Sequence, residues 1–219
     1  MKRAAVLAAA AVLLAALPAR ANPPVADVFR TRSLAAHDLS AVPQWTDALA
    51  RARAEAAALR APRSGEACAG VSAAAWCAAV AAARPLPRGR QIYEINRFVN
   101  AMLGKAEDPG VPPAGERWPA LAEALRGRGG GLAAAVVKYL SLREVGVPSE
   151  ILRIVVVEDI LRGDRTALLL AREGSDEVVL SLDTDVLRGA ARTANLRPYY
   201  SFNETTLWMH VPETQEISP

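Results

Sequence analysis

The stretch RGRGGGLAAAVVKYLSLREVGVPSEILRIVVVED, residues 126 to 159, decides the fold of this chain. A glycine run opens a strongly apolar helix, and Gly146 and Pro148 close it. A run of β-branched residues follows and predicts a strand over 151–159. A helix that begins behind glycines looks like the start of an active site, yet the glycine run contains no nucleophile, acid or imidazole.

Helices are predicted before this stretch and strands after it. Alanine-rich segments bounded by prolines predict helices over 42–60 and 71–83, and apolar residues spaced by three and four predict a buried helical stripe over 92–102. Further strands are predicted over 166–172, 177–183, 199–204 and 205–211, with EGSD as a hairpin turn between the first two. We therefore predict one α+β domain over 41–219, in which the helix over 131–146 packs on an antiparallel sheet, preceded by an extended arm over 22–40.

The first 21 residues have the pattern of a secretory signal. Lys2 and Arg3 precede an apolar stretch, and Ala19-Arg20-Ala21 fits the small-x-small rule for a cleavage site. We predict cleavage after Ala21 and a periplasmic or secreted protein that meets the membrane only through this segment. An uncleaved anchor is the alternative, although the apolar stretch is short for a membrane span.

Charge and the glycine run both argue against nucleotide or nucleic-acid binding. The predicted signal carries three basic residues and no acid, so its removal takes the formal net charge from +3 to zero. A neutral chain gives no electrostatic basis for a nucleic-acid partner. The glycine run lacks the Lys-Ser/Thr of a phosphate-binding loop and follows no predicted strand. We expect no cofactor.

Cys68 and Cys77 are the only two cysteines of the chain. In an exported protein an even pair predicts a disulfide, and Gly70 would allow the intervening chain to bend. Two buried free thiols are the alternative, because a regular helix would hold these positions too far apart. A reactive thiol at Cys77 is a further possibility.

Five stretches together resemble one known family, the bacterial transglutaminase-like cysteine proteinases, which include the LapG-type periplasmic proteases. They are DLSAVPQW (38–45), INRFVN (95–100), KYLSLREVGVPSEILRIVVVED (138–159), LSLD (180–183) and YYSFNETTLWMH (199–210). The resemblance implies a papain- and transglutaminase-like α+β fold. It also implies a catalytic cysteine at the start of the central helix, with a histidine and an aspartate on the following strands.

The family's central helix opens with Gly-Asp-Cys-Glu-Asp-Tyr-Ala-x-Ala-Lys-Tyr. Alignment on Lys138-Tyr139 places the cysteine position on Gly131. The histidine position falls on Arg165, within one residue, and the aspartate position on Asp183. The resemblance thus implies that only the aspartate is retained, because Gly131 has no side chain and Arg165 stays protonated. An ion pair between Arg165 and Asp183 is expected in place of the catalytic pair, with a solvated acid at the strand end as the alternative for Asp183.

The resemblance also implies that metal binding is lost. The acids that help to bind calcium in the LapG-type proteases fall on Gly130, Leu132 and Ala133, none of which has a side-chain oxygen. We therefore expect no metal site.

These positions predict an exported homologue without catalytic residues that binds a periplasmic protein or peptide segment. The expected binding groove consists of Trp118, Gly129, Gly130, Gly131, Arg165 and Asp183. Two alternatives are a residual cysteine peptidase or amidase that acts through other residues, and a purely structural periplasmic domain.

Overall fold

The structure is a computed structural model of the 219-residue chain. It describes residues 29, 31–60, 71–104, 110–113, 115–126, 130–174, 176–189 and 193–212. The predicted signal over 1–21 lies outside these residues. No helix within them is long and apolar enough to cross a membrane.

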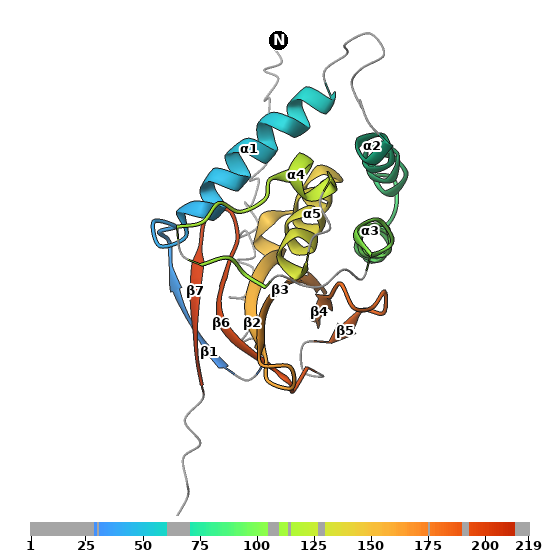
Figure 1. Cartoon of the computed structure of the whole chain (residues 1–219). Coiled ribbons are helices and arrows are strands. Elements are labelled where there is room, and N and C mark those ends of the chain that lie inside the picture. Colours follow the sequence, from blue (N-terminus) through green and yellow to red (C-terminus); the bar gives the residue numbers. More distant parts are fainter. Residues whose placement is uncertain are drawn as a thin grey trace, which may run out of the picture.

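One antiparallel sheet of seven strands runs through the described residues, in the order β1-β7-β6-β2-β3-β4-β5 (Figure 1). Its strands are β1 (Thr31–Ala36), β2 (Leu152–Asp159), β3 (Asp164–Glu173), β4 (Asp176–Leu180), β5 (Arg188–Gly189), β6 (Leu196–Phe202) and β7 (Leu207–Pro212). The predicted α+β architecture is confirmed. The strand over 151–159 lies at the centre of the sheet, between β6 and β3.

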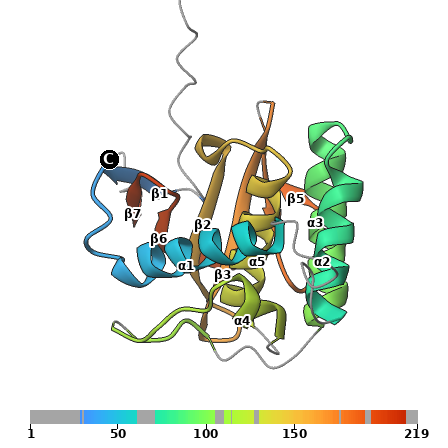
Figure 2. The ribbon, with the colours of Figure 1, turned by 90° about the horizontal axis from the view of Figure 1, so that it is seen from above.

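Among the described residues, five α-helices precede β2: α1 (Pro43–Arg60), α2 (Val71–Ala83), α3 (Arg88–Leu103), α4 (Leu121–Arg126) and α5 (Gly131–Glu144). A short 3-10 turn, Ser149–Ile151, then leads into β2. The helices α2 and α3 lie side by side, and α5 lies between them and the centre of the sheet (Figures 1 and 2). The predicted helix on the sheet is therefore α5.

The sequence of α5 explains its central place. Every residue from Gly131 to Tyr139 is buried, because alanine, valine and leucine occupy all sides of the helix. A helix without a polar face must be surrounded by protein. The helix ends at Glu144. Gly146 follows with a φ of +98°, which favours glycine, and the Val147 amide donates to the Leu142 carbonyl at 2.9 Å.

Alternation along β3 divides the interior into two parts. Ala167, Leu169 and Ala171 join the main core with the helices, whereas Leu168 and Leu170 belong to a second cluster on the other face of the sheet. Residues on β3 with odd numbers thus lie on the face that α5 covers. This parity fixes the side of the sheet on which a functional group at Arg165 lies.

The structure contains two strands that the sequence pattern did not predict. Residues 31–36 of the expected arm pair with β7 and form β1, an edge strand, and the two residues of β5 pair with β4. Both are short and have mixed composition. Their extended conformation is imposed by the neighbouring strand rather than by their own residues.

Candidate functional site

The start of α5 occupies the place that the resemblance gives to the nucleophile. Gly130 is the N-cap residue, with no side chain to cap the helix, and the Ala134 amide donates to its carbonyl at 3.1 Å. Gly130 and Gly131 are both buried, and Gly129 lies outside the described residues. No side chain at these two positions can attack a substrate.

The predicted calcium positions also lack the necessary chemistry. Leu132 and Ala133 are 3% and 7% exposed and belong to the main core. Calcium requires six to eight oxygen ligands, mostly carboxylates and carbonyls. Within the described parts of the chain, no group of three or more His, Cys, Asp and Glu side chains could hold a metal ion. The residues present therefore do not fit the calcium site of the family.

Arg165 lies at the start of β3, on the face of the sheet that α5 covers. Its guanidinium carbon is 4.7 Å from the centroid of the Tyr199 ring, a cation–π arrangement. Glu158 lies opposite Arg165 in the register of β2 and β3. Its carboxylate accepts hydrogen bonds from Arg197 and from the Tyr199 hydroxyl. These hydrogen bonds keep the pKa of Glu158 below its usual value. Arg165 is exposed and cannot serve as a base.

A loop approaches the histidine position closely. Gly110 has a φ of +77°, and a Cβ atom at this residue would lie 3.0 Å from the Arg165 carbonyl oxygen. The loop backbone can come this near to β3 because glycine has no side chain.

Asp183 follows β4 and does not form the predicted ion pair with Arg165. Its side chain is 69% exposed, and its carboxylate lies 3.9 Å from the guanidinium of Arg162 in the β2–β3 turn. The Ser181 hydroxyl also donates to it at 3.3 Å. The expectation of an Arg165–Asp183 pair is wrong, because Arg165 is held over Tyr199 while Arg162 extends toward Asp183.

Trp118 does not line a surface groove. Its side chain is 2% exposed, and its ring centroid lies 5.4 Å from that of Phe202. The ring of Trp118 is therefore part of the core under α4 and β6. Of the six residues expected in a groove, Arg165 and Asp183 are exposed, while Trp118, Gly130 and Gly131 are buried.

A reactive thiol at Cys77 is excluded because this cysteine forms a disulfide. Cys77 is disulfide-bonded, and it packs against the main core from α2. The other cysteine of the chain, Cys68, lies outside the described residues. A sulfur in a disulfide cannot act as a thiolate nucleophile without prior reduction.

Lys138 served above only to align the central helix, and the resemblance gives it no role. Its side chain is fully buried in α5, and its ammonium donates to the Ser181 carbonyl at 2.8 Å. Burial lowers the pKa of Lys138 to about 7, although the carboxylates of Asp185 and Asp183 act in the opposite direction. This lysine ties the central helix to the segment that follows β4.

Two asparagines of α3 hold the same segment. The Asn96 amide donates to the carbonyls of Thr184 and Asp185, both at 3.3 Å, and the Asn100 amide donates to the Thr184 carbonyl at 2.9 Å. Asp183 therefore lies in a segment that is fixed from two helices, although its own carboxylate faces solvent.

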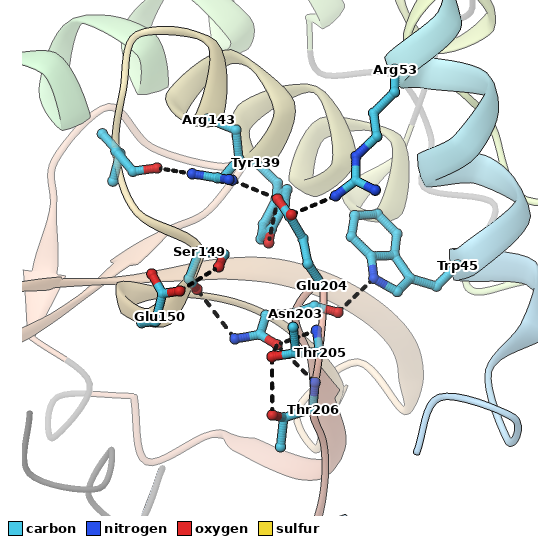
Figure 3. A network of polar contacts seen from close by, with 11 residues as sticks. Trp45, Arg53, Tyr139, Arg143, Ser149, Glu150, Asn203, Glu204, Thr205 and Thr206 are labelled. Atoms are coloured by element: carbon cyan, nitrogen blue, oxygen red, sulfur yellow. Dashed lines mark hydrogen bonds and ion pairs between the residues drawn. The ribbon is translucent and has the colours of Figure 1, made fainter. Parts of the chain in front are cut away.

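A polar network at the other end of α5 was missed by the sequence reasoning (Figure 3). Glu204 accepts hydrogen bonds from Arg143 of α5 and Arg53 of α1, both at 2.5 Å, and from the Tyr139 hydroxyl at 3.4 Å. The NETT segment that contains it was visible in the sequence. Its partners lie 61 to 151 residues away, and no local spacing reveals them.

Asn203 organises the turn beside Glu204 (Figure 3). Its side-chain oxygen accepts from the amides of Thr205 and Thr206, both at 2.9 Å, and its carbonyl accepts from the Trp45 indole at 2.7 Å. The indole is fully buried against Tyr139 and Phe202. The first helix, the central helix and the last hairpin are thereby joined.

Together these features define a transglutaminase-like framework, a central helix on an antiparallel sheet. Gly131, Arg165 and Asp183 are the residues on which the resemblance places the catalytic positions. Comparison with solved structures agrees with this fold. The chain is similar to LapG of Legionella pneumophila, with a TM-score of 0.56 and 22% sequence identity over 72% of this chain and 87% of that one.

Two further structures of the same protein are also similar. The calcium-bound form has a TM-score of 0.57 and 22% identity, over 77% of this chain and 93% of that one. The EGTA-treated form has a TM-score of 0.57 and 23% identity, over 72% and 84%. No protein-family model matches the sequence, and a search of curated proteins finds no match either.

Proposed function

We propose that this protein is an exported, non-catalytic relative of the LapG-like cysteine proteases that binds a polypeptide without cutting it. The observation that carries the proposal is the start of α5, where a buried Gly131 occupies the position of the nucleophile. A residue without a side chain can neither attack a peptide bond nor be activated by the helix N-terminus.

The imidazoles of the chain support the loss of catalysis. His37 hydrogen-bonds to Thr206 at 3.2 Å, and His210 of β7 hydrogen-bonds to Ser201 of β6 at 2.8 Å. Both belong to the β1–β7 side of the sheet, which β6 and β2 separate from β3. With Cys77 in a disulfide, the described residues contain no free thiol beside an imidazole.

Binding is supported by the side chains around Arg165. In the β2–β3 turn, Ile160 is 53% exposed and Leu161 81% exposed, and Val186 in the segment after β4 is 65% exposed. The Arg162–Asp183 pair connects the two segments. Exposed aliphatic side chains beside the exposed guanidinium of Arg165 suit a polypeptide partner.

A peptidase assay tests the catalytic part of the proposal. The purified protein should cut no member of a fluorogenic peptide library, and the double variant Gly131→Cys/Arg165→His should also be inactive, because the acids at 130, 132 and 133 are missing. Cleavage by the natural chain that Asp183→Ala abolishes would overturn the loss of catalysis. Cleavage by the double variant alone would show that the missing acids are dispensable.

Site-specific crosslinking tests the binding part. A photoreactive residue at Leu161 should yield a discrete crosslinked partner in a periplasmic extract, and Arg165→Glu should reduce its yield. The same probe at Met209, which is 48% exposed on β7, is the matched control. Equal crosslinking from both positions would contradict a binding surface near Arg165 and would favour a purely structural domain.

A further inference from the structure

A hollow lies at the C-terminal end of α5, away from the degenerate catalytic positions. It has a volume of about 220 Å³ and is lined by residues of α1, α2, α4 and α5 and by Glu204. Arg143, on its rim, is separated from Gly131 by about 18 Å along the helix, at 1.5 Å per residue. The hollow is therefore distinct from the site derived from the resemblance.

The floor of the hollow is apolar. On α1, the small side chains of Ala52 and Ala56 leave space that a larger residue would fill. The apolar lining consists of Leu49, Ala52, Ala56, Trp76, Leu121 and Leu140. A floor of this kind favours an apolar body over water.

The carboxylates on the rim already have partners. Glu204 accepts from Arg53, Arg143 and the Tyr139 hydroxyl (Figure 3), and Glu144 lies 3.3 Å from the guanidinium of Arg84. A cationic ligand would have to compete with these arginines for the same oxygens.

The guanidinium groups on the rim, those of Arg53 and Arg143, have N–H donors left for a ligand. A guanidinium has five N–H donors. Arg53 uses one nitrogen on Glu204, and Arg143 uses its Nε on Glu204 and one terminal nitrogen on the Val147 carbonyl at 2.7 Å. The remaining donors have no acceptor in the described part of the chain.

We propose that this hollow binds a small amphipathic carboxylate, whose apolar body lies on the floor and whose carboxylate accepts hydrogen bonds from Arg53 and Arg143. The size agrees with this class of ligand, because an apolar cavity of about 150 Å³ accommodates benzene. About 220 Å³ thus holds one ring with a short acidic arm. The side chain of Arg53 is 60% exposed, so a ligand can enter past it.

Calorimetric titration of the purified protein with 3-phenylpropanoate tests the site. We expect binding in about the millimolar range or tighter, as is usual for ligands of this size. The matched cation, 3-phenylpropylamine, should bind at least about tenfold more weakly, because it loses the charge-assisted hydrogen bonds. Absence of binding by the acid, or equal binding of acid and amine, would overturn the proposal.

Variants locate the binding. Arg53→Gln should weaken 3-phenylpropanoate binding about tenfold, and Ala56→Leu should abolish it by filling the floor. Arg97→Gln is the matched control, because Arg97 is also 60% exposed and paired with a glutamate, but on α3. Unchanged affinity in both Arg53→Gln and Ala56→Leu would place the ligand elsewhere and refute this site.

Discussion

The two ends of α5 differ in their side chains: the N-terminal end is buried and has no reactive group, whereas the C-terminal end forms a polar network. At the N-terminal end, Gly130, Gly131 and Leu132 are buried and have no reactive group. Arg165 and Asp183, on β3 and after β4, are exposed and contact Tyr199 and Arg162. At the C-terminal end, Arg143 and Tyr139 meet Glu204 in a network that joins three distant segments.

This difference shows that the framework does not depend on reactive side chains at the start of α5. The contacts that place α5 on the sheet are the apolar sides of the helix and the Glu204 network, neither of which requires a nucleophile. The fold therefore needs no cysteine at position 131 and no histidine at position 165. The following variants test this division, from the largest expected effect to the smallest.

Trp45→Ala should have the largest effect, because it removes the fully buried ring that packs at 5.2 Å from both Tyr139 and Phe202. It also leaves the Asn203 carbonyl without its indole donor. We expect the free energy of unfolding in urea to fall by about 4 kcal/mol. Leu34→Ala, at a position 49% exposed on β1, should change it by less than about 0.5 kcal/mol. Similar losses in the two variants would contradict the central role of Trp45.

Glu204→Gln should lower the free energy of unfolding by about 2 kcal/mol, because the charge between Arg53 and Arg143 is lost in a half-buried setting. Glu94→Gln is the matched control. Glu94 also lies between two arginines, Arg90 and Arg97, but on the exposed face of one helix. Its loss should cost less than about 0.5 kcal/mol, and equal costs would mean that the network adds no more than surface ion pairs.

Lys138 should make stability depend on pH. Its pKa is lowered to about 7 in the folded chain, so between about pH 7 and 9 the unfolded chain binds more protons. The free energy of unfolding should then rise with pH in this interval, by up to about 1.4 kcal/mol per pH unit. Lys138→Met should flatten this slope in urea unfolding series, and an unchanged slope would assign the effect to other groups.

Asp183→Ala should have the smallest effect. The carboxylate is 69% exposed, and its nearest cation is the guanidinium of Arg162 at 3.9 Å. We expect the free energy of unfolding, measured by heat or urea, to change by less than about 0.5 kcal/mol. A loss of more than about 1 kcal/mol would show that Asp183 has a structural role.

The sequence predicts the central part of the fold well because its pattern is strong there. The apolar run of α5, the glycine at 146 and the β-branched run of β2 each favour one conformation. The edge strands β1 and β5 could not be predicted in this way, because their pairing depends on β7 and β4 rather than on their own residues.

For the candidate site, the sequence predicted the elements but not the side-chain contacts. Gly131, Arg165 and Asp183 lie at the start of α5, at the start of β3 and just after β4, and their role as a site stays a prediction. The burial of Trp118 and the choice of Arg162 over Arg165 depend on side-chain packing between segments that are distant in the sequence. A one-dimensional pattern contains no information on such choices.

The pairing of β1 with β7 has a consequence for the order in which the chain folds. Thr31 and His210 are hydrogen-bonded neighbours although 179 positions separate them. The backbone of β1, the first strand of the described residues, therefore pairs only once β7, the last of them, has been made. Contacts of such long range close late and slowly, so a chain that stops before β7 would leave β1 as an unpaired strand open to aggregation.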